Sequence, residues 1–130
     1  MIADTSLIID IMKSDVEAVN KIKDLENKGV AVMTTSISIF ELFVGVTISI
    51  KQDQERKKIM RILDGLSIIG FDEDSAKEAG RIFAEKRKAG LTIDPEDAMI
   101  AGICVRRNET IITRNRKHFE GIEDLKLDTY

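Results

Sequence analysis

Residues 30–50 read VAVMTTSISIFELFVGVTISI, an almost uncharged run on which the choice of fold class rests. The run is long enough for a membrane span. However, threonine and serine side chains interrupt it, and Glu41 would lie near the bilayer midplane at a cost of about 3 kcal/mol. A buried strand that ends at the hydroxyl cluster and leads into a buried helix explains the run better. We therefore expect a strand–helix unit here and no membrane span.

The same change from a short apolar run to helical periodicity recurs along the rest of the chain. Strands are expected at Met1–Ala3, Val30–Thr34, Ser67–Gly70 and Thr110–Thr113, with a weak fifth near Leu125–Leu127. Helices are expected at Ser6–Met12, Val16–Lys28, Ser36–Ile48, Gln52–Leu63, Asp72–Ala89 and Pro95–Arg107. Strands that alternate with helices imply right-handed crossovers and a parallel sheet covered on both faces. The pattern predicts one α/β domain over residues 1–130.

Composition limits the chemistry that is open to this chain. Cys104 is the only cysteine and His118 the only histidine, so an internal disulfide is excluded. A zinc site would need carboxylates for most of its ligands, and no nucleophile elbow accompanies the histidine for a serine-type triad. The lone cysteine and the absence of a signal peptide predict a cytoplasmic protein. The net charge of −3 does not itself suggest nucleic-acid binding, although basic residues are concentrated in residues 106–117.

Three acidic residues stand at places where acids are unusual. Asp4 directly follows the first strand, and Glu41 lies one to two turns into the helix that follows the second strand. Asp97 lies in the first turn of the helix that begins at Pro95. Because the carboxyl ends of parallel strands meet at one edge of a sheet, we expect the three acids to converge there.

Helical spacing also places two of these acids in line with apolar residues, so we expect both on buried faces. Glu41 aligns with Ile37, Val44, Gly45 and Ile48, and Asp97 aligns with Ile100, Ala101, Cys104 and Val105. Buried and clustered carboxylates are costly and resist ionisation, and a hard divalent cation removes both problems. The pattern therefore predicts a Mg²⁺ or Mn²⁺ site that supports phosphoryl chemistry.

Each acid also has a purely structural interpretation. Asp4 could cap the helix that begins near Ser6, and the spacing from Ser38 to Glu41 matches a capping box. Asp97 suits a first helical turn because the helix dipole favours an acid there. For each residue taken alone both interpretations stay open, and the joint arrival of the three acids at one sheet edge favours a shared site.

Four segments, in this order, resemble motifs of the PIN domain family and of its VapC branch, the toxins of toxin–antitoxin pairs. They are MIADTSLIID (residues 1–10), TTSISIFEL (34–42), DAMIAG (97–102) and ITRNRKHF (112–119). The resemblance implies a three-layer α/β/α sandwich with a central parallel sheet of four to five strands. It also implies a Mg²⁺ or Mn²⁺ site and the hydrolysis of phosphodiester bonds in RNA.

The resemblance assigns roles to individual residues as well. It implies metal ligands at Asp4, Glu41 and Asp97, an orienting residue at Ser6, and residues that support metal-bound waters at Thr113 and Asn115. Many family members carry a fourth acid in the last motif, where Asn115 and His118 stand here, so the number of metal ions is left open. Asp94 is a possible substitute, although its first interpretation is a helix cap.

The basic run near the C-terminus offers the expected contacts to RNA. Arg114, Arg116 and Lys117 could bind flanking phosphates, and a solvated surface explains them equally well. His118 is a possible general acid, but beside Phe119 a structural role is the first expectation.

The resemblance further implies two protein partners, a small antitoxin that covers the acidic site and a second copy of the chain in a homodimer. The uncharged run around Phe40, Phe43 and Val44 and the helix Gln52–Leu63 could supply the surfaces, although core packing explains these residues equally well.

Two other functions stay open. A PIN-fold binding module with a degraded site would fit the missing fourth acid. A phosphatase or receiver-type domain would use Asp4 as its nucleophile, although Ser6 stands where haloacid-type phosphatases carry a second aspartate.

Overall fold

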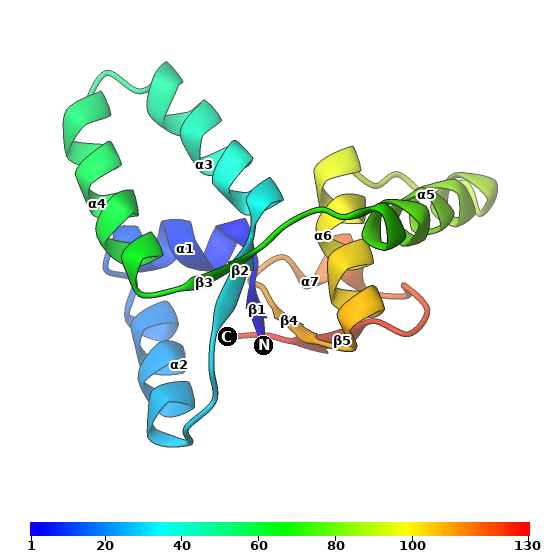
Figure 1. The fold of residues 1–130 in the computed structure, drawn as a ribbon, viewed down its shortest axis with the longest axis horizontal. Coiled ribbons are helices and arrows are strands. Elements are labelled where there is room, and N and C mark those ends of the chain that lie inside the picture. The colour runs from blue at the N-terminus through cyan, green and yellow to red at the C-terminus, as the bar shows by residue number, and fades with distance from the viewer.

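The computed structural model describes residues 1–130, which form a three-layer α/β/α fold (Figure 1). Five strands form one sheet in the order β3-β2-β1-β4-β5, and every neighbouring pair is parallel. The strands are β1 (Ile2–Ala3), β2 (Met33–Thr35), β3 (Ser67–Ile69), β4 (Thr110–Ile112) and β5 (Lys126–Asp128). The helices are α1 (Thr5–Met12), α2 (Val16–Asn27), α3 (Ser36–Ile48), α4 (Gln52–Asp64), α5 (Glu73–Lys88), α6 (Pro95–Arg107) and α7 (Arg116–Phe119). The predicted α/β fold with a parallel central sheet is confirmed.

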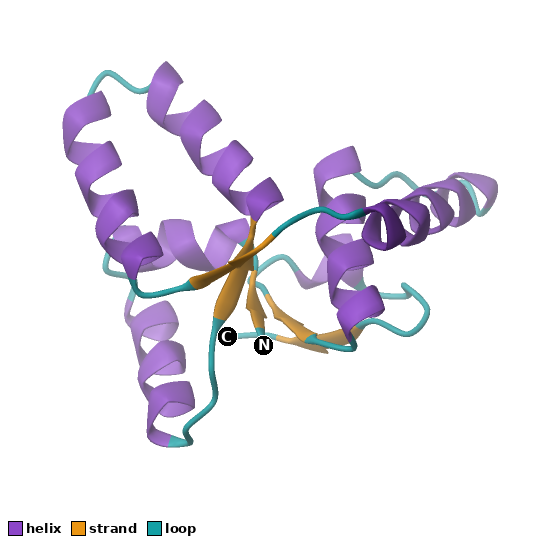
Figure 2. Cartoon of the chain, viewed as in Figure 1, coloured by secondary structure: helices purple, strands orange, loops and turns teal.

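The two faces of the sheet carry separate hydrophobic cores. Helices α1 to α4 lie on one side of the sheet, and α5 to α7 lie on the other (Figure 1; Figure 2). Side chains alternate along a strand, so Ile2 and Ala3 of β1 fall in different cores, as do Ile111 and Ile112 of β4. Burial on both faces explains why these strands read as uninterrupted apolar runs in the sequence.

Most predicted boundaries agree with the structure to within one or two residues, and the exceptions are the start of β2 and the helix α7. Strand β2 begins at Met33 rather than Val30, because Val30 and Val32 approach the sheet from α2 and pack against the core beneath α1 to α4. Helix α7 was not predicted at all. It spans four residues, which is too short for a helical period to show in the sequence.

Helices α3 and α4 form a hairpin that extends beyond the sheet (Figure 1). The buried stripe of α3 is Ser38, Leu42 and Val46, which corrects the expectation that Glu41 shares a buried face with Val44 and Ile48. Val44 is 44% exposed and Ile48 is 78% exposed. The cause is that α3 is apolar almost all round, so its periodicity carries no information on which face is covered. None of the seven helices combines the length and the apolar character that a membrane crossing requires.

Candidate active site

The structure brings the three predicted acids together at the carboxyl edge of the sheet. Asp4 follows β1, Glu41 lies in the second turn of α3, which directly follows β2, and Asp97 lies in the first turn of α6. They are close enough that the charges of Asp4 and Asp97 both act on the carboxyl group of Glu41. The fold thus gathers residues that are far apart in the sequence into one acidic cluster.

Asp4 occupies the N-cap position of α1, but its side chain makes no capping hydrogen bond. Its Oδ2 atom instead accepts hydrogen bonds from Ser6 Oγ at 2.9 Å and from Thr113 Oγ1 at 2.7 Å. The two hydroxyls are held in turn, because the backbone N–H of Asn115 donates to Thr113 Oγ1 at 3.0 Å and that of Arg114 donates to Ser6 Oγ at 3.3 Å. The interpretation of Asp4 as a side-chain cap is therefore wrong.

Glu41 does not belong to a capping box. Helix α3 begins at Ser36, and its cap is Thr35, whose Oγ1 accepts from the backbone N–H of Ser38 at 3.0 Å. Glu41 Oε1 instead accepts a hydrogen bond from Thr5 Oγ1 at 2.7 Å, which joins α3 to the first residue of α1. The structural interpretation drawn from the Ser38–Glu41 spacing is thus wrong as well.

Asp97 contacts the only histidine of the chain. His118 Nδ1 lies 2.9 Å from Asp97 Oδ2, and the Asp97 side chain is 14% exposed against 49% for His118. Ile100 and Cys104, which align with Asp97 on α6, are fully buried as expected. Asp94 stands at the N-cap of α6 without a side-chain capping bond, so the cap expected of its carboxylate is not formed.

Burial and mutual repulsion make two of the acids difficult to ionise. Burial raises the pKa of Glu41 above its ordinary value, and the charges of Asp4 and Asp97 raise it further. Burial is also the main cause that raises the pKa of Asp97, where the charge of Asp4 adds to the effect and the hydrogen bond with His118 opposes it. A nearby positive charge would reverse both shifts.

Each of the three carboxylates keeps one oxygen without a protein partner. Asp4 Oδ2, Glu41 Oε1 and Asp97 Oδ2 are engaged, whereas the second oxygen of each carboxylate accepts no hydrogen bond. Carboxylate oxygens are hard ligands of the kind that Mg²⁺ and Mn²⁺ prefer, so the donor set fits such an ion. As the side chains stand, no three acidic, histidine or cysteine side chains converge tightly enough to hold one ion. Ligation by all three acids therefore requires rotation of a flexible side chain such as Glu41.

Arg114 is already occupied by carboxylates of the chain itself. Its guanidinium lies 3.0 Å from Asp10 and 3.0 Å from Asp15, and it stacks 5.5 Å from the ring centre of Tyr130. Tyr130 donates a 2.6 Å hydrogen bond to Asp10. Arg114 thus ties the start of α2 and the end of α1 to Tyr130, the second residue after β5. Its role as an RNA contact stays a prediction.

The other two basic residues of the run are more open. Arg116 forms only an exposed pair with Glu120 at 3.5 Å, and Lys117 has no carboxylate partner. Lys117 also lines a cavity of about 230 Å³ beside Asp97, together with His118 and Asp94. The cavity beside Asp97 therefore has a lysine without a carboxylate partner in its lining.

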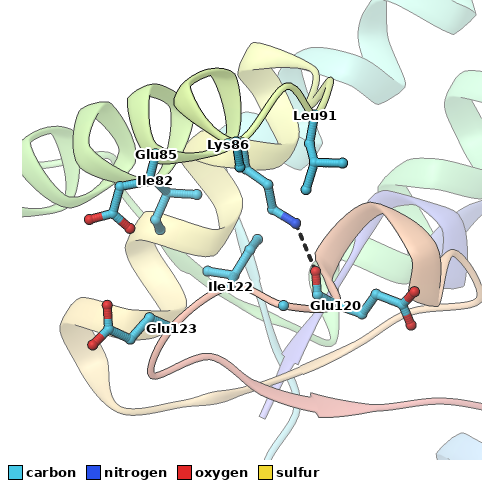
Figure 3. A pocket seen from close by; sticks show the side chains of 9 residues that line it. Ile82, Glu85, Lys86, Leu91, Glu120, Ile122 and Glu123 are labelled. Carbon is cyan, nitrogen blue, oxygen red and sulfur yellow. Dashed lines mark hydrogen bonds between the residues drawn. The ribbon is translucent and has the colours of Figure 1, made fainter.

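A second hollow lies away from the acids, between α5 and residues 120–123 (Figure 3). Lys86 Nζ donates to the backbone oxygen of Glu120 at 2.8 Å across it, and the side chains of Glu85 and Glu123 lie nearby. No predicted site residue lines this hollow. It is not part of the acidic cluster.

Three partners of the acids were not predicted from the sequence. They are Thr5 for Glu41, His118 for Asp97, and Thr113 for Asp4, since Thr113 was expected to support metal-bound waters. No spacing pattern connects them, because they contact the acids across 36, 21 and 109 residues of chain. The only hint in the sequence about His118 was its apolar neighbour Phe119, which suggested a structural role. In α7 Phe119 is buried, and because adjacent side chains on a helix point in different directions, His118 does not enter the core with it.

Comparisons with known proteins agree with this fold. The family described as PIN domain matches residues 1–125. Ribonuclease VapC3 of Methanocaldococcus jannaschii is 33% identical over 102 residues, which cover 78% of this chain and 95% of the relative. The tRNA(fMet)-specific endonuclease VapC of Salmonella typhimurium is 25% identical over 98% of this chain and 95% of its own length. A crystal structure of VapBC2 from Rickettsia felis, bound to a DNA fragment from their promoter, superposes with a TM-score of 0.91 at 28% identity. That match covers 99% of this chain and 97% of the other.

Proposed function

We propose that this chain, which belongs to the PIN domain family and is an endoribonuclease of the toxin–antitoxin type, hydrolyses RNA at a metal site formed by Asp4, Glu41 and Asp97. PIN-domain nucleases depend on divalent metal ions, and the oxygen-only donor set favours Mg²⁺ or Mn²⁺ here. The observation that carries the proposal is the cluster of three carboxylates, each oriented through one oxygen and free at the other.

The chain's own part in the reaction is to hold the ligands in place. When bound, the cation would supply positive charge that stabilises the reacting phosphate, and it would lower the pKa of a water so that the water becomes a stronger nucleophile near neutral pH. Ser6 and Thr113 fix one oxygen of Asp4, and Thr5 fixes one oxygen of Glu41. The Asn115 side chain is exposed and has no protein partner, so it can hydrogen-bond a water at this edge.

The RNA backbone approaches from the side of α7 in this proposal. Lys117 lies exposed in the cavity beside Asp97, and Arg116 follows Asn115 at the start of the same helix. Both can bind phosphates that flank the cleaved bond. Asp94, whose carboxylate caps nothing, is the acid best placed to complement the three ligands if a second cation binds.

Two protein surfaces follow from the same reading. An antitoxin is the expected partner, and we place it over the acids. The face of α3 that carries Phe40, Val44 and Ile48 is apolar and exposed, and we assign it to a homodimer.

The two cores flank one sheet, which supports treating residues 1–130 as one nuclease domain. The lone buried Cys104 suits a cytoplasmic protein.

The two alternative functions are less well supported. A degraded binding module would not need three carboxylates that are each held by a donor. A phosphatase or receiver-type domain would need Asp4 as a free nucleophile, whereas two hydroxyls hold its Oδ2 atom. Membership of the PIN domain family removes this second alternative.

Cleavage of RNA by single-acid variants tests the proposal. We expect cleavage to require Mg²⁺ or Mn²⁺, to stop with a chelator, and to fall about 100-fold or more in Asp4→Asn, Glu41→Gln and Asp97→Asn. The matched control is Asp53→Asn, which removes an exposed acid of α4 and should leave the rate unchanged. Chelator-resistant cleavage, or equal rates in the control and the three variants, would refute the proposal.

A further inference from the structure

Each acid of the proposed metal site has one carboxylate oxygen that is hydrogen-bonded within the protein. In each case the donor is a side chain of the protein. For Asp4 the donors are Ser6 and Thr113, at 2.9 and 2.7 Å. For Glu41 the donor is Thr5, at 2.7 Å. Donors of this kind fix the orientation of a ligating carboxylate, and their loss typically costs about 10- to 100-fold in metal affinity.

Asp97 has only one candidate for this part. His118 Nδ1 lies 2.9 Å from Asp97 Oδ2, and no other side chain of the protein donates to Asp97. Because Asp97 lies in the first turn of α6, its carboxylate would otherwise be free to rotate within the cavity that it lines.

The ring of His118 is well placed to restrain that rotation. It projects from α7, whose last residue Phe119 is 1% exposed and anchors the helix in the core beneath α5 and α6. The backbone N–H of His118 also donates to the carbonyl of Asn115 at 3.0 Å. His118 on α7 and Asp97 on α6 are thus both held by helices that pack in the core.

A purely stabilising role explains the contact less well. His118 is about half exposed, and ion pairs at such positions contribute only about 0 to 1 kcal/mol to stability. His118 also lies in the segment where many family members carry a fourth acid. A histidine there can donate a hydrogen bond to Asp97, whereas an ionised acid could not.

We propose that His118 is a positioning residue of the metal site, whose Nδ1–H holds Asp97 Oδ2 so that Asp97 Oδ1 is presented to the cation. This inference rests on the proposed function and deepens it. It assigns to His118 for Asp97 the part that Thr5 takes for Glu41.

Titration of Mn²⁺ by calorimetry into the metal-free protein tests the role without any use of enzymatic activity. His118→Phe keeps a ring of similar size and removes the donor, whereas His118→Asn restores an N–H group near the position of Nδ1. We expect Mn²⁺ affinity to fall about 10-fold or more in the phenylalanine variant and to recover in the asparagine variant. Loss of a merely structural contact would lower the melting temperature without this pattern in affinity.

Asp97→Asn, titrated alongside, separates this inference from the proposed function. If Asp97→Asn loses Mn²⁺ binding while His118→Phe binds as tightly as the wild type, the positioning role is overturned and the metal site stands. An asparagine variant as weak as the phenylalanine variant also overturns the role. If the wild type binds no Mn²⁺, the metal site and the role of His118 fall together.

Discussion

At the scale of single residues, Glu41 and Asp97 destabilise the metal-free fold while they supply ligands to the proposed metal site. Burial and neighbouring acids raise the pKa of both in the folded chain, so the folded state binds these protons more tightly than the unfolded state. Without metal, the two charged carboxylates therefore destabilise the folded chain fully at pH values above the raised pKa values. This destabilisation is relieved as the pH falls through the raised pKa values towards those of the unfolded chain. Proton binding competes with metal, so the affinity for Mn²⁺ should decline over the same range of pH.

Neutral substitutions should accordingly stabilise the metal-free protein. We expect Glu41→Gln and Asp97→Asn to raise its melting temperature at neutral pH, because each removes a charge that the site disfavours. Asp72→Asn is the opposite control. Hydrogen bonds from Ser75 at the start of α5 lower the pKa of Asp72, so its charge stabilises the fold above the unfolded pKa and its removal should lower the melting temperature. Thermal melting in chelator measures all three, and lower melting temperatures for both site variants would contradict the account.

Arg114 and Lys117 should separate stability from RNA binding. Arg114→Met removes the pairs with Asp10 and Asp15 and should lower the melting temperature without changing the salt dependence of RNA binding. Lys117→Met should leave the melting temperature unchanged. It should reduce the slope of log affinity against log salt by about 0.7 for single-stranded RNA, the value of one phosphate contact. Fluorescence anisotropy with labelled RNA measures the slopes, and the reverse pattern would show that the assignments are exchanged.

At the scale of elements, the crossing of α5 and α6 fixes where Asp97 stands. A Cβ atom on Gly102 of α6 would lie 2.7 Å from the backbone nitrogen of Ala79 and 2.7 Å from the backbone oxygen of Ser75, both in α5. These two atoms belong to the backbone of α5, so they can move away only if the whole helix moves. Only glycine therefore allows the two helices to approach this closely.

Alanine at Gly102 should be destabilising, by about 1 to 3 kcal/mol, because the helices must move apart. Gly80 in α5 is the matched control, since open space surrounds its Cβ position. Gly80→Ala should stabilise the protein by about 0.5 to 1 kcal/mol through the lower entropy of the unfolded chain. Denaturant unfolding measures both free energies, and a Gly102→Ala protein as stable as the wild type would contradict this packing.

The elements also show how far the sequence alone could lead. The parallel sheet and the six longer helices follow from apolar runs and helical periods, and the topology rule places Asp4, Glu41 and Asp97 at one edge. The covered face of α3 could not be predicted because that helix is apolar almost all round. Its cap could not be chosen either, since Thr35, Ser36 and Ser38 are all possible caps and only the end of β2 selects Thr35.

The finer contacts of the site depend on tertiary structure. Thr5 reaches Glu41 only because α1 and α3 start at neighbouring strands, and His118 reaches Asp97 only through α7, which is too short to predict. Arg114 looked like a nucleic-acid contact in the sequence, where its two carboxylate partners are about 100 residues away.

At the scale of the whole molecule, two groups of helices pack on opposite faces of one sheet (Figure 1). Asp4 and Glu41 belong to elements of one group, and Asp97 belongs to a helix of the other. The α3–α4 hairpin extends from one group and carries Phe40, Val44 and Ile48 on an uncovered apolar face. An uncovered stripe of this kind is costly in water, which supports its assignment to a homodimer.

Light scattering of two valine variants tests this interface. Val44→Glu places a charge within the stripe and should convert the proposed homodimer to a monomer. Val16→Glu, at an exposed valine of α2 outside the stripe, should leave the dimer intact. A monomeric wild type, or a Val44→Glu protein that stays dimeric, would show that the stripe serves another purpose.

Anomalous scattering from a Mn²⁺-soaked crystal tests most directly whether Asp4, Glu41 and Asp97 bind one divalent cation. We expect a peak at the manganese edge within coordinating distance of one oxygen from each of the three carboxylates. We also expect Glu41 to have turned to reach the ion. A peak at another site, with none between these three acids, would contradict the proposed metal site.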